Sequence, residues 1–285
     1  MPRFKNNFNL KKFTNIINIL SKFNNISKKP KNLFYNQGIR EANKLKKLII
    51  KENYKVINLN GSNEKLSKKI ILLSNLMGKS VPQNINKEKY VVIEPNLKLL
   101  KKYKNISNNK IRYHQTNKGG SIHTDGPQLN KSPNILIMGC IKNSVRGGET
   151  ILVDSKKLFK KIKNQDQKSA EILQKKIFFE RRGFGGNIKT LSKKIFDINK
   201  DKFEFRYLRE YINSAYKIKK IKIPNNKKKA LDLLDVFLHK KEMQTKLKLN
   251  IGDVILINNK AIAHGRTSFT LSKNKPRKLL RIWVN

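Results

Sequence analysis

Two histidines and one aspartate have the types and spacing of a metal site. His123 and Asp125 lie two positions apart, just after a Gly119-Gly120 turn, and His264 lies far along the chain. Alternate residues of a strand project from one face, so one strand can present His123 and Asp125 together while His264 arrives from another strand. Two imidazoles and one carboxylate are the ligands of mononuclear non-haem Fe(II) sites with open coordination positions. The three residues therefore predict an iron site that activates O2.

Polar residues elsewhere in the chain suit a small acid bound beside this metal. Arg277 follows His264 at a short distance, and Arg281 comes four positions later on the same apolar segment. Guanidinium groups form paired hydrogen bonds with carboxylates. Thr150, which follows a Gly147–Glu149 turn, offers a hydroxyl to the same group. These residues predict a site for a dicarboxylate co-substrate.

Taken in order, these motifs resemble those of the taurine dioxygenase and clavaminate synthase-like superfamily of Fe(II)/2-oxoglutarate-dependent oxygenases. The similarity runs from about residue 39 to residue 285 and is strongest over 120–154 and 257–284. In that family H-x-D/E is followed by G-G-E/D-T, then by a distal histidine and R-x-x-x-R. The resemblance implies that the iron ligands are His123, Asp125 and His264. It also implies that Arg277 and Thr150 bind the distal carboxylate of 2-oxoglutarate.

The same resemblance implies a reaction. 2-Oxoglutarate and O2 would give succinate and CO2 while a C–H bond of a second substrate is hydroxylated. Related halogenases lack the carboxylate at Asp125, so halogenation is disfavoured, whereas desaturation and ring closure stay open. Arg281 has the position at which relatives hold an anionic group, and it equally suits a structural ion pair. With Gln128 and Arg206 as further substrate contacts, we expect a small anionic or zwitterionic substrate, such as an amino acid or a sulfonate-like acid.

The net charge of +46 raises the alternative of a nucleic-acid partner. Only 11 of the 65 basic residues are arginine, and lysine is enriched together with asparagine and isoleucine along the chain, which is typical of a compositional bias. We therefore expect a solvated lysine-rich surface and no nucleic-acid substrate. Two alternatives stay open: a nucleic-acid- or protein-modifying oxygenase with the same iron chemistry, and a non-catalytic barrel that binds a metal or ligand.

Cysteine usage and hydropathy bear on the compartment. The single cysteine, Cys140, lies in an apolar run and cannot form an intrachain disulfide, which suits a reducing compartment. No apolar run reaches the roughly 18 residues that a membrane span needs. We expect a soluble cytoplasmic protein. Near the N-terminus, Phe13, Ile16, Ile17 and Leu20 recur at helical spacing among lysines, which favours an ordinary packed or frayed helix over a targeting or membrane-surface segment.

Periodicity predicts a mainly β protein with flanking helices. We expect strands at 55–59, 90–94, 134–142, 149–153, 175–180, 203–207, 253–258 and 279–284, and helices at 38–52, 63–77, 155–174 and 226–242. Together with the resemblance, this pattern indicates a double-stranded β-helix, the jelly-roll barrel. We expect one catalytic domain at 38–285 with a helical insert at about 155–250, after a basic, flexible or helical segment at 1–37. Of the other histidines, His114 is a further pocket candidate, and His239 is expected at a helix end.

Overall fold

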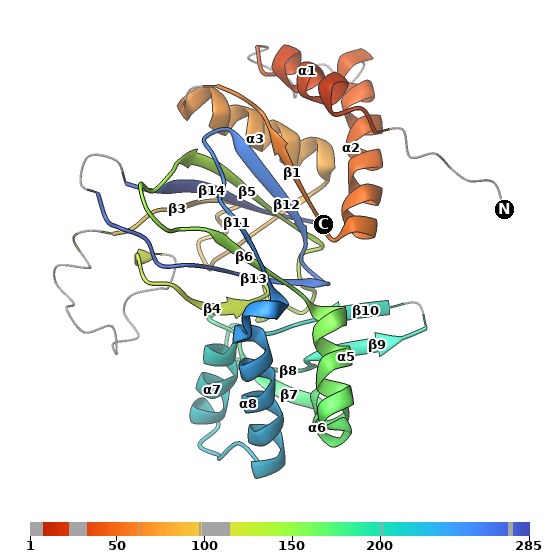
Figure 1. Ribbon diagram of the computed structural model, residues 1–285, viewed down its shortest axis with the longest axis vertical. Coiled ribbons are helices and arrows are strands. Elements are labelled where there is room, and N and C mark those ends of the chain that lie inside the picture. Colours follow the sequence, from red (N-terminus) through yellow and green to blue (C-terminus); the bar gives the residue numbers. More distant parts are fainter. Residues whose placement is uncertain are drawn as a thin grey trace.

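Two antiparallel sheets form the centre of the molecule (Figure 1). The computed structural model describes residues 8–22, 33–61, 63–96, 98, 115–200, 202–272 and 276–285. The larger sheet has the strand order β1-β12-β5-β14-β2, with β3 also paired to β14. Its strands are β1 (Tyr54–Asn58), β2 (Ser80–Val81), β3 (Tyr90–Ile93), β5 (Ile135–Lys142), β12 (Asp253–Asn258) and β14 (Lys278–Val284). The smaller sheet has the order β11-β6-β13-β4, formed by β4 (Gly120–His123), β6 (Thr150–Asp154), β11 (Gln244–Leu247) and β13 (Ile262–Arg266).

The pleat of the strands divides their side chains between the interior and the outer faces. On β5, Leu136 and Cys140 pack with Leu152 of β6 and Trp283 of β14 in a cluster between the two sheets. Ile137, one position along β5, belongs instead to a second cluster under the helices. Because side chains alternate along a strand, the larger sheet packs apolar side chains on both faces, against the helices on one face and against the smaller sheet on the other. The same alternation decides which side chains reach the site.

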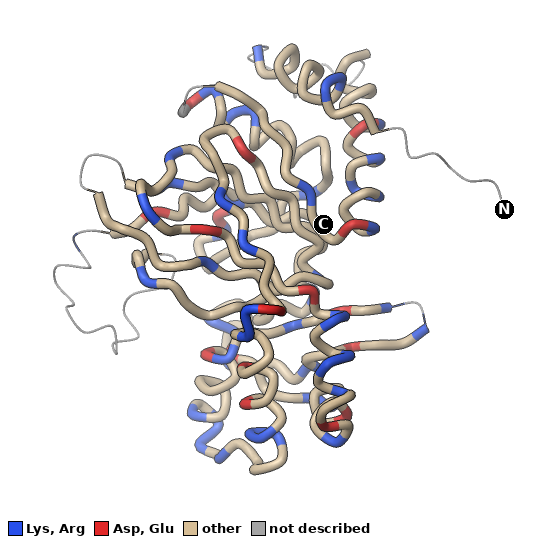
Figure 2. The backbone as a smooth tube through the Cα atoms, viewed as in Figure 1, with Lys and Arg blue, Asp and Glu red and all other residues tan. Residues whose placement is uncertain are grey.

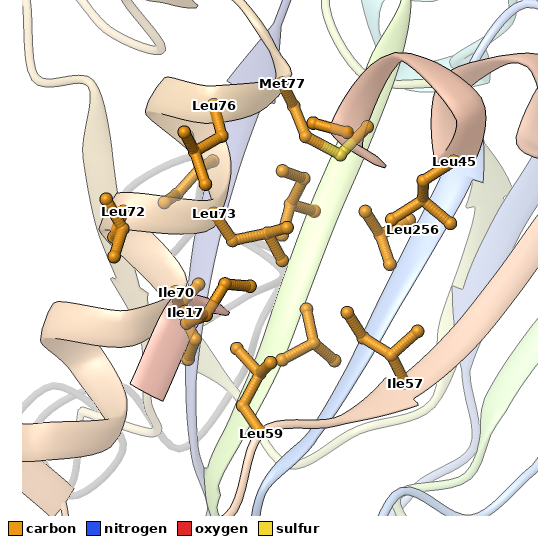
Figure 3. Close-up of a cluster of buried hydrophobic side chains, with 14 of the residues drawn as sticks. Ile17, Leu45, Ile57, Leu59, Ile70, Leu72, Leu73, Leu76, Met77 and Leu256 are labelled. Atoms are coloured by element: carbon orange, nitrogen blue, oxygen red, sulfur yellow. The ribbon is translucent and has the colours of Figure 1, made fainter. Parts of the chain in front are cut away.

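Three N-terminal helices cover the outer face of the larger sheet. They are α1 (Leu10–Leu20), α2 (Leu33–Glu52) and α3 (Asn63–Met77). Figure 3 shows Ile17, Leu45 and Leu73 from these helices close to Ile57 and Leu256 of the sheet. All four apolar residues singled out on the N-terminal helix, namely Phe13, Ile16, Ile17 and Leu20, are buried. The predicted helix is therefore present, and it is packed rather than frayed, with its apolar face in the core.

The segment between β6 and β11 covers the outer face of the smaller sheet. It contains α5 (Ser155–Gln165), α6 (Gln167–Leu173), α7 (Arg209–Ile218), α8 (Asn225–His239) and a 3-10 turn (Lys241–Met243). It also contains two hairpins, β7 (Lys176–Glu180) with β8 (Thr190–Lys194), and β9 (Phe196–Asn199) with β10 (Lys202–Phe205). The predicted helical insert is thus a mixed α/β layer. The helix predicted over 155–174 is two helices, because Asp166 ends α5 and caps α6.

Charge is distributed as the composition predicts. Figure 2 shows Lys and Arg on the helices at both ends of the molecule and on the strands between them. His239 is exposed at the end of α8, as expected. Within the described ranges, no helix has both the length and the hydropathy to cross a bilayer.

Candidate active site

A cavity of about 660 Å³ opens where the inner faces of the two sheets meet the insert. Its inner wall is formed by alternate residues of the central strands. From the smaller sheet come His123, Thr150, His264 and Arg266, and from the larger sheet come Met138, Leu279, Arg281 and Trp283. The segment before α7 and α7 itself close the opposite wall with Leu208, Glu210, Tyr211 and Lys217. One pocket therefore collects residues that are distant in sequence.

The structure brings the three predicted metal ligands together. His264 on β13 pairs in register with His123 on β4, and their ring centroids are 4.7 Å apart. Asp125 follows β4, with Oδ1 at 3.8 Å from Nε2 of His123 and Oδ2 at 3.7 Å from Nε2 of His264. One ligand atom from each residue lies within 4.8 Å of the others. Such a spacing leaves room for one ion at the centre of the three.

Backbone contacts fix the aspartate at the end of its strand. The N–H of Asp125 donates to Oδ1 of Asn259, whose Nδ2 group donates to the carbonyl of Asp125, both at 2.9 Å. Thr124 exchanges two hydrogen bonds with the backbone of Tyr207, which links this strand to the insert. Gly126 has a φ of 71°, and a Cβ there would lie 2.6 Å from Cδ of Pro133. The chain can therefore turn directly after Asp125 only with glycine at position 126.

The protonation states of the cluster suit a cation. Burial lowers the pKa of His264 to about 3, so its imidazole is neutral at physiological pH and retains a lone pair for a metal. Burial alone would raise the pKa of Asp125, but the charge of Arg281 and both histidines lower it, and the carboxylate is ionised. Nδ1 of His264 has no hydrogen-bond partner within the described residues, and Nε2 lies beyond hydrogen-bond range of Asp125. This donor set fits Fe(II).

Arg277 and Thr150 lie on the wall of the same cavity, and both are buried. Arg277 donates from Nη2 to the carbonyl of Gly148 at 3.3 Å and lies over the ring of Phe269. The glycine turn allows this approach, because a Cβ on Gly148 would lie 3.0 Å from Nε of Arg277. A buried guanidinium beside a buried hydroxyl can bind a carboxylate with charge-assisted hydrogen bonds. The structure thus places Arg277 and Thr150 on the wall of one cavity, and their assignment to a dicarboxylate subsite stays a prediction.

Arg281 directly contacts Asp125, one of the three candidate metal ligands. Its Nη1 lies 3.2 Å from Oδ1 of Asp125, and its Nε donates to Oε1 of Gln83 at 2.7 Å. Trp283, two positions along β14, donates from Nε1 to Oδ2 of Asp125 at 2.9 Å. The structural ion pair that the sequence left open is therefore present, and the guanidinium also lines the cavity.

The other two substrate candidates differ in their placement. Gln128 lines the cavity, and its buried Oε1 has no hydrogen-bond partner among the described residues. Arg206 does not line this cavity. Its guanidinium donates to the carbonyls of Pro127 and Leu129 and pairs with Glu204 at 3.1 Å. Arg206 thus holds in place the loop that carries Gln128.

Several residues of the cavity carried no signal in the sequence. Gln83 comes from the loop between β2 and β3, and Glu180 and Arg182 come from the end of β7. No short motif marks any of them, and only the fold brings them to the cavity that Asp125 also lines. The candidate pocket residue His114 lies outside the described residues.

One buried imidazole, one partly buried imidazole and a buried carboxylate lie in a cavity between antiparallel sheets with arginines beside them, and this donor set suits a mononuclear iron site. The sequence pattern of the family described as "Taurine catabolism dioxygenase TauD, TfdA family" matches residues 52–283, and the chain belongs to this family. The family predicted from the motifs is confirmed.

Curated relatives match part of the chain. Human gamma-butyrobetaine dioxygenase is 29% identical over 157 residues, which are 52% of this chain and 40% of that protein. FR-33289 synthase of Streptomyces rubellomurinus is 24% identical over 187 residues, 63% of this chain and 53% of that protein. The matches thus span about half the length of these relatives.

Solved structures show the same fold over nearly the whole chain. An asparagine oxygenase in complex with Fe(II), 2S,3S-3-hydroxyasparagine and succinate aligns with a TM-score of 0.70 at 10% identity, covering 96% of this chain and 90% of that one. The non-heme iron oxygenase OrfP in complex with Fe and alpha-ketoglutaric acid aligns with a TM-score of 0.66 at 13% identity, covering 96% and 91%.

Proposed function

We propose that the protein is an Fe(II)- and 2-oxoglutarate-dependent dioxygenase that hydroxylates a small zwitterionic acid. The observation that carries this proposal is the cluster of His123, Asp125 and His264 in the same cavity as Arg277 and Thr150. We further propose that the two facing antiparallel sheets form the jelly-roll barrel of a single catalytic domain at 38–285. Their shared apolar interior and the similarity to solved oxygenase folds support this architecture.

In the proposed mechanism His123, Asp125 and His264 hold iron, and Arg277 with Thr150 binds the distal carboxylate of 2-oxoglutarate. The bound iron supplies the redox chemistry that couples O2 to formation of succinate and CO2. The residues of the chain provide orientation. Trp283 and Arg281 each hold one oxygen of the Asp125 carboxylate, which restricts its rotation. Because outer contacts of this kind fix metal ligands, we assign both residues a role in metal affinity.

Apolar side chains on the same wall limit water at the reacting centre. Met138 and Leu279 line the cavity beside the cluster, and Ile93 lies on the neighbouring strand β3. Exclusion of water strengthens the ion pairs and hydrogen bonds that bind two acids in one pocket. It also protects a reactive centre from side reactions with solvent.

The polar groups that face this space favour a substrate with both signs of charge. The buried Oε1 of Gln128 can only accept a hydrogen bond, and the carboxylate of Glu180, which is largely buried at the cavity wall, pairs with Nη1 of Arg182 at 3.4 Å. An unsatisfied buried acceptor is costly, so a donor on a ligand gains from reaching it. We therefore propose that Gln128 accepts a hydrogen bond from an ammonium group and that Arg281 binds a carboxylate.

Amino acids are the first substrates to test under this proposal. The named ligands of the structural neighbours include hydroxyasparagine and (3S)-hydroxy-L-Arg, and the human relative is named for a betaine. These names support a substrate with a cationic nitrogen and a carboxylate. Purified protein with Fe(II) and labelled 2-oxoglutarate should form succinate faster when the correct acid is added. A panel of amino acids, betaines and sulfonates, with RNA and DNA oligonucleotides as the competing class, identifies the substrate class.

A further inference from the structure

Gln83 lies on the cavity wall although it comes from a distant part of the chain. It belongs to the loop between β2 and β3, is buried, and is separated by 198 positions from Arg281. The backbone N–H of Gln83 donates to the carbonyl of Glu88 at 2.8 Å, which fixes the loop locally. Its side chain is directed toward β14 and away from the bulk solvent.

Every polar group of this side chain has a partner. Nε2 of Gln83 donates to the carbonyls of Lys89 and Arg281, both at 2.8 Å, and Oε1 accepts from Nε of Arg281 at 2.7 Å. A primary amide has two N–H donors, and both are used here. The single amide therefore binds Arg281 twice, once through the backbone and once through the guanidinium.

These contacts leave the guanidinium of Arg281 little freedom. Nε is held by Gln83, Nη1 by Asp125 at 3.2 Å, and the planar face lies over the ring of Trp283. Because a guanidinium is rigid and planar, these three contacts define its orientation. Nη2 has no hydrogen-bond partner within the part of the chain that the structure describes, and the residue lines the cavity. Nη2 is thus the group available to a ligand.

The contact with Gln83 also limits what Arg281 does to Asp125. An arginine with both edges available can form two parallel hydrogen bonds with one carboxylate. With Nε occupied by Gln83, only Nη1 reaches Asp125. Oδ2 of Asp125 then receives no hydrogen bond from Arg281, and the guanidinium is directed partly into the cavity. The amide of Gln83 therefore leaves Arg281 with one contact to Asp125 and one edge that faces the substrate space.

We propose that Gln83 is a positioning residue that orients Arg281 for recognition of the carboxylate of the substrate. The inference rests on the proposed function and deepens it, since it names the residue that sets the direction of the substrate-binding arginine. The catalytic chemistry stays with other residues, and Gln83 acts through Arg281.

A double-mutant cycle tests the proposal with the unchanged chain, Gln83→Met, Arg281→Met and the double variant. Methionine resembles glutamine in length and cannot replace its hydrogen bonds. We expect Gln83→Met alone to raise the KM of the stimulating acid about tenfold, as for a lost hydrogen bond to a charged group. In the Arg281→Met background the same change should have no further effect, since residues that act as a unit are not additive. Fully additive effects would overturn the proposal.

Two variants separate positioning from loop stability. Gln83→Glu retains an acceptor oxygen for Nε of Arg281 but directs its other oxygen at the carbonyls of Lys89 and Arg281, so we expect its KM to lie between those of the unchanged chain and of Gln83→Met. Asn84→Ala removes the acceptor for the N–H of Glu88 in the same loop and does not contact Arg281. We expect its KM to be unchanged. An effect of Asn84→Ala equal to that of Gln83→Met would reduce Gln83 to a structural residue of the loop.

A second readout does not depend on turnover. In 15N-labelled protein the Nε–H signal of Arg281, assigned by its loss in Arg281→Met, should exchange slowly with water because Gln83 accepts it. Gln83→Met should accelerate this exchange. Equal exchange in both proteins would refute the positioning role, whether or not any substrate is found. Absence of 2-oxoglutarate turnover with preserved slow exchange would instead count against the proposed function alone.

Discussion

His264 lies directly opposite His123 in the pairing of β13 with β4, and the ladder shifts its register between His264 and Arg266. Since side chains alternate along a strand, a slip of one residue would direct one imidazole away from the cavity. The register is supported from the other side of β13, where His264 pairs with Leu152 of β6. The relative position of His123 and His264 is therefore determined by the strand pairing as well as by the sequence motifs.

Replacing Asp125 tests the ligand assignment. We expect Asp125→Ala to abolish substrate-dependent succinate formation and to weaken Fe(II) binding, because the two imidazoles lose their anionic partner. Succinate release and metal content after dialysis measure the two effects. Asp197→Ala, on a surface hairpin, is the matched control and should retain turnover. Unchanged turnover in Asp125→Ala would remove this residue from the metal site.

A substitution at Trp283 tests the hydrogen bond to Asp125 and leaves the three candidate metal ligands unchanged. Trp283→Phe removes the hydrogen bond from Nε1 to Oδ2 of Asp125 and keeps an aromatic ring between the sheets. We expect the dissociation constant for Fe(II) to rise about tenfold, the lower end of the effect of lost outer contacts to metal ligands. Titration with Fe(II) under anaerobic conditions measures it. A constant within error of that of the unchanged chain would show that Arg281 alone suffices to hold the carboxylate.

Thr150 tests the co-substrate subsite. Thr150→Val keeps the shape of the side chain and removes its hydroxyl, so the distal carboxylate of 2-oxoglutarate loses one donor. We expect the KM for 2-oxoglutarate to rise about fivefold, as for one lost hydrogen bond of about 1 kcal/mol. The KM for the second substrate should stay constant. The opposite pattern would place Thr150 in the substrate subsite.

A substitution at Gly148 tests whether Arg277 needs the space that this glycine leaves. A Cβ at this position would lie 2.6 Å from Oγ of Ser144 and 3.0 Å from Nε of Arg277, and its φ is 75°. Gly148→Ala should therefore raise the KM for 2-oxoglutarate and lower the melting temperature. Gly186→Ala is the control, since φ there is 56° with no atom within 4 Å of the added Cβ. If both substitutions changed the KM for 2-oxoglutarate and the melting temperature equally, the effect at Gly148 would come from its positive φ and not from the contact with Arg277.

Cys140 provides a test of the packing between the sheets. Burial raises the pKa of its thiol to about 11, so at pH 8 only about one molecule in a thousand carries the reactive thiolate. We expect iodoacetamide to leave the folded protein unmodified at this pH and to alkylate it after denaturation, as mass spectrometry would show. Rapid labelling of folded protein would contradict the buried position.

Sequence patterns predicted the strands with dense apolar runs within a few residues, as at β5, β12 and β14. β13 was not predicted as a strand, because Ile262–Arg266 contains histidine, glycine and arginine, and these residues serve the site rather than the core. β8, β9 and β11 were also not predicted, whereas β7 and β10 of the insert were predicted at 175–180 and 203–207. The missed strands depend on pairing partners that the local sequence does not reveal.

Some residues of the candidate site could likewise be predicted from the sequence, and others could not. The ligand cluster, Thr150 and Arg277 lie in short motifs with a recognisable order, so the sequence could predict them together. Gln83 lies in no motif and depends on a partner 198 positions away. The sequence could not show that Arg206 lies outside the cavity. Its guanidinium contacts the Pro127–Leu129 loop instead, and these contacts depend on how the insert folds.

Release of CO2 from labelled 2-oxoglutarate by the purified protein tests the central claim most directly. The account predicts slow, Fe(II)-dependent release without a second substrate, stimulation by a zwitterionic acid, and loss of both in His264→Ala. Release that is independent of iron, or no release with iron and 2-oxoglutarate bound, would contradict it.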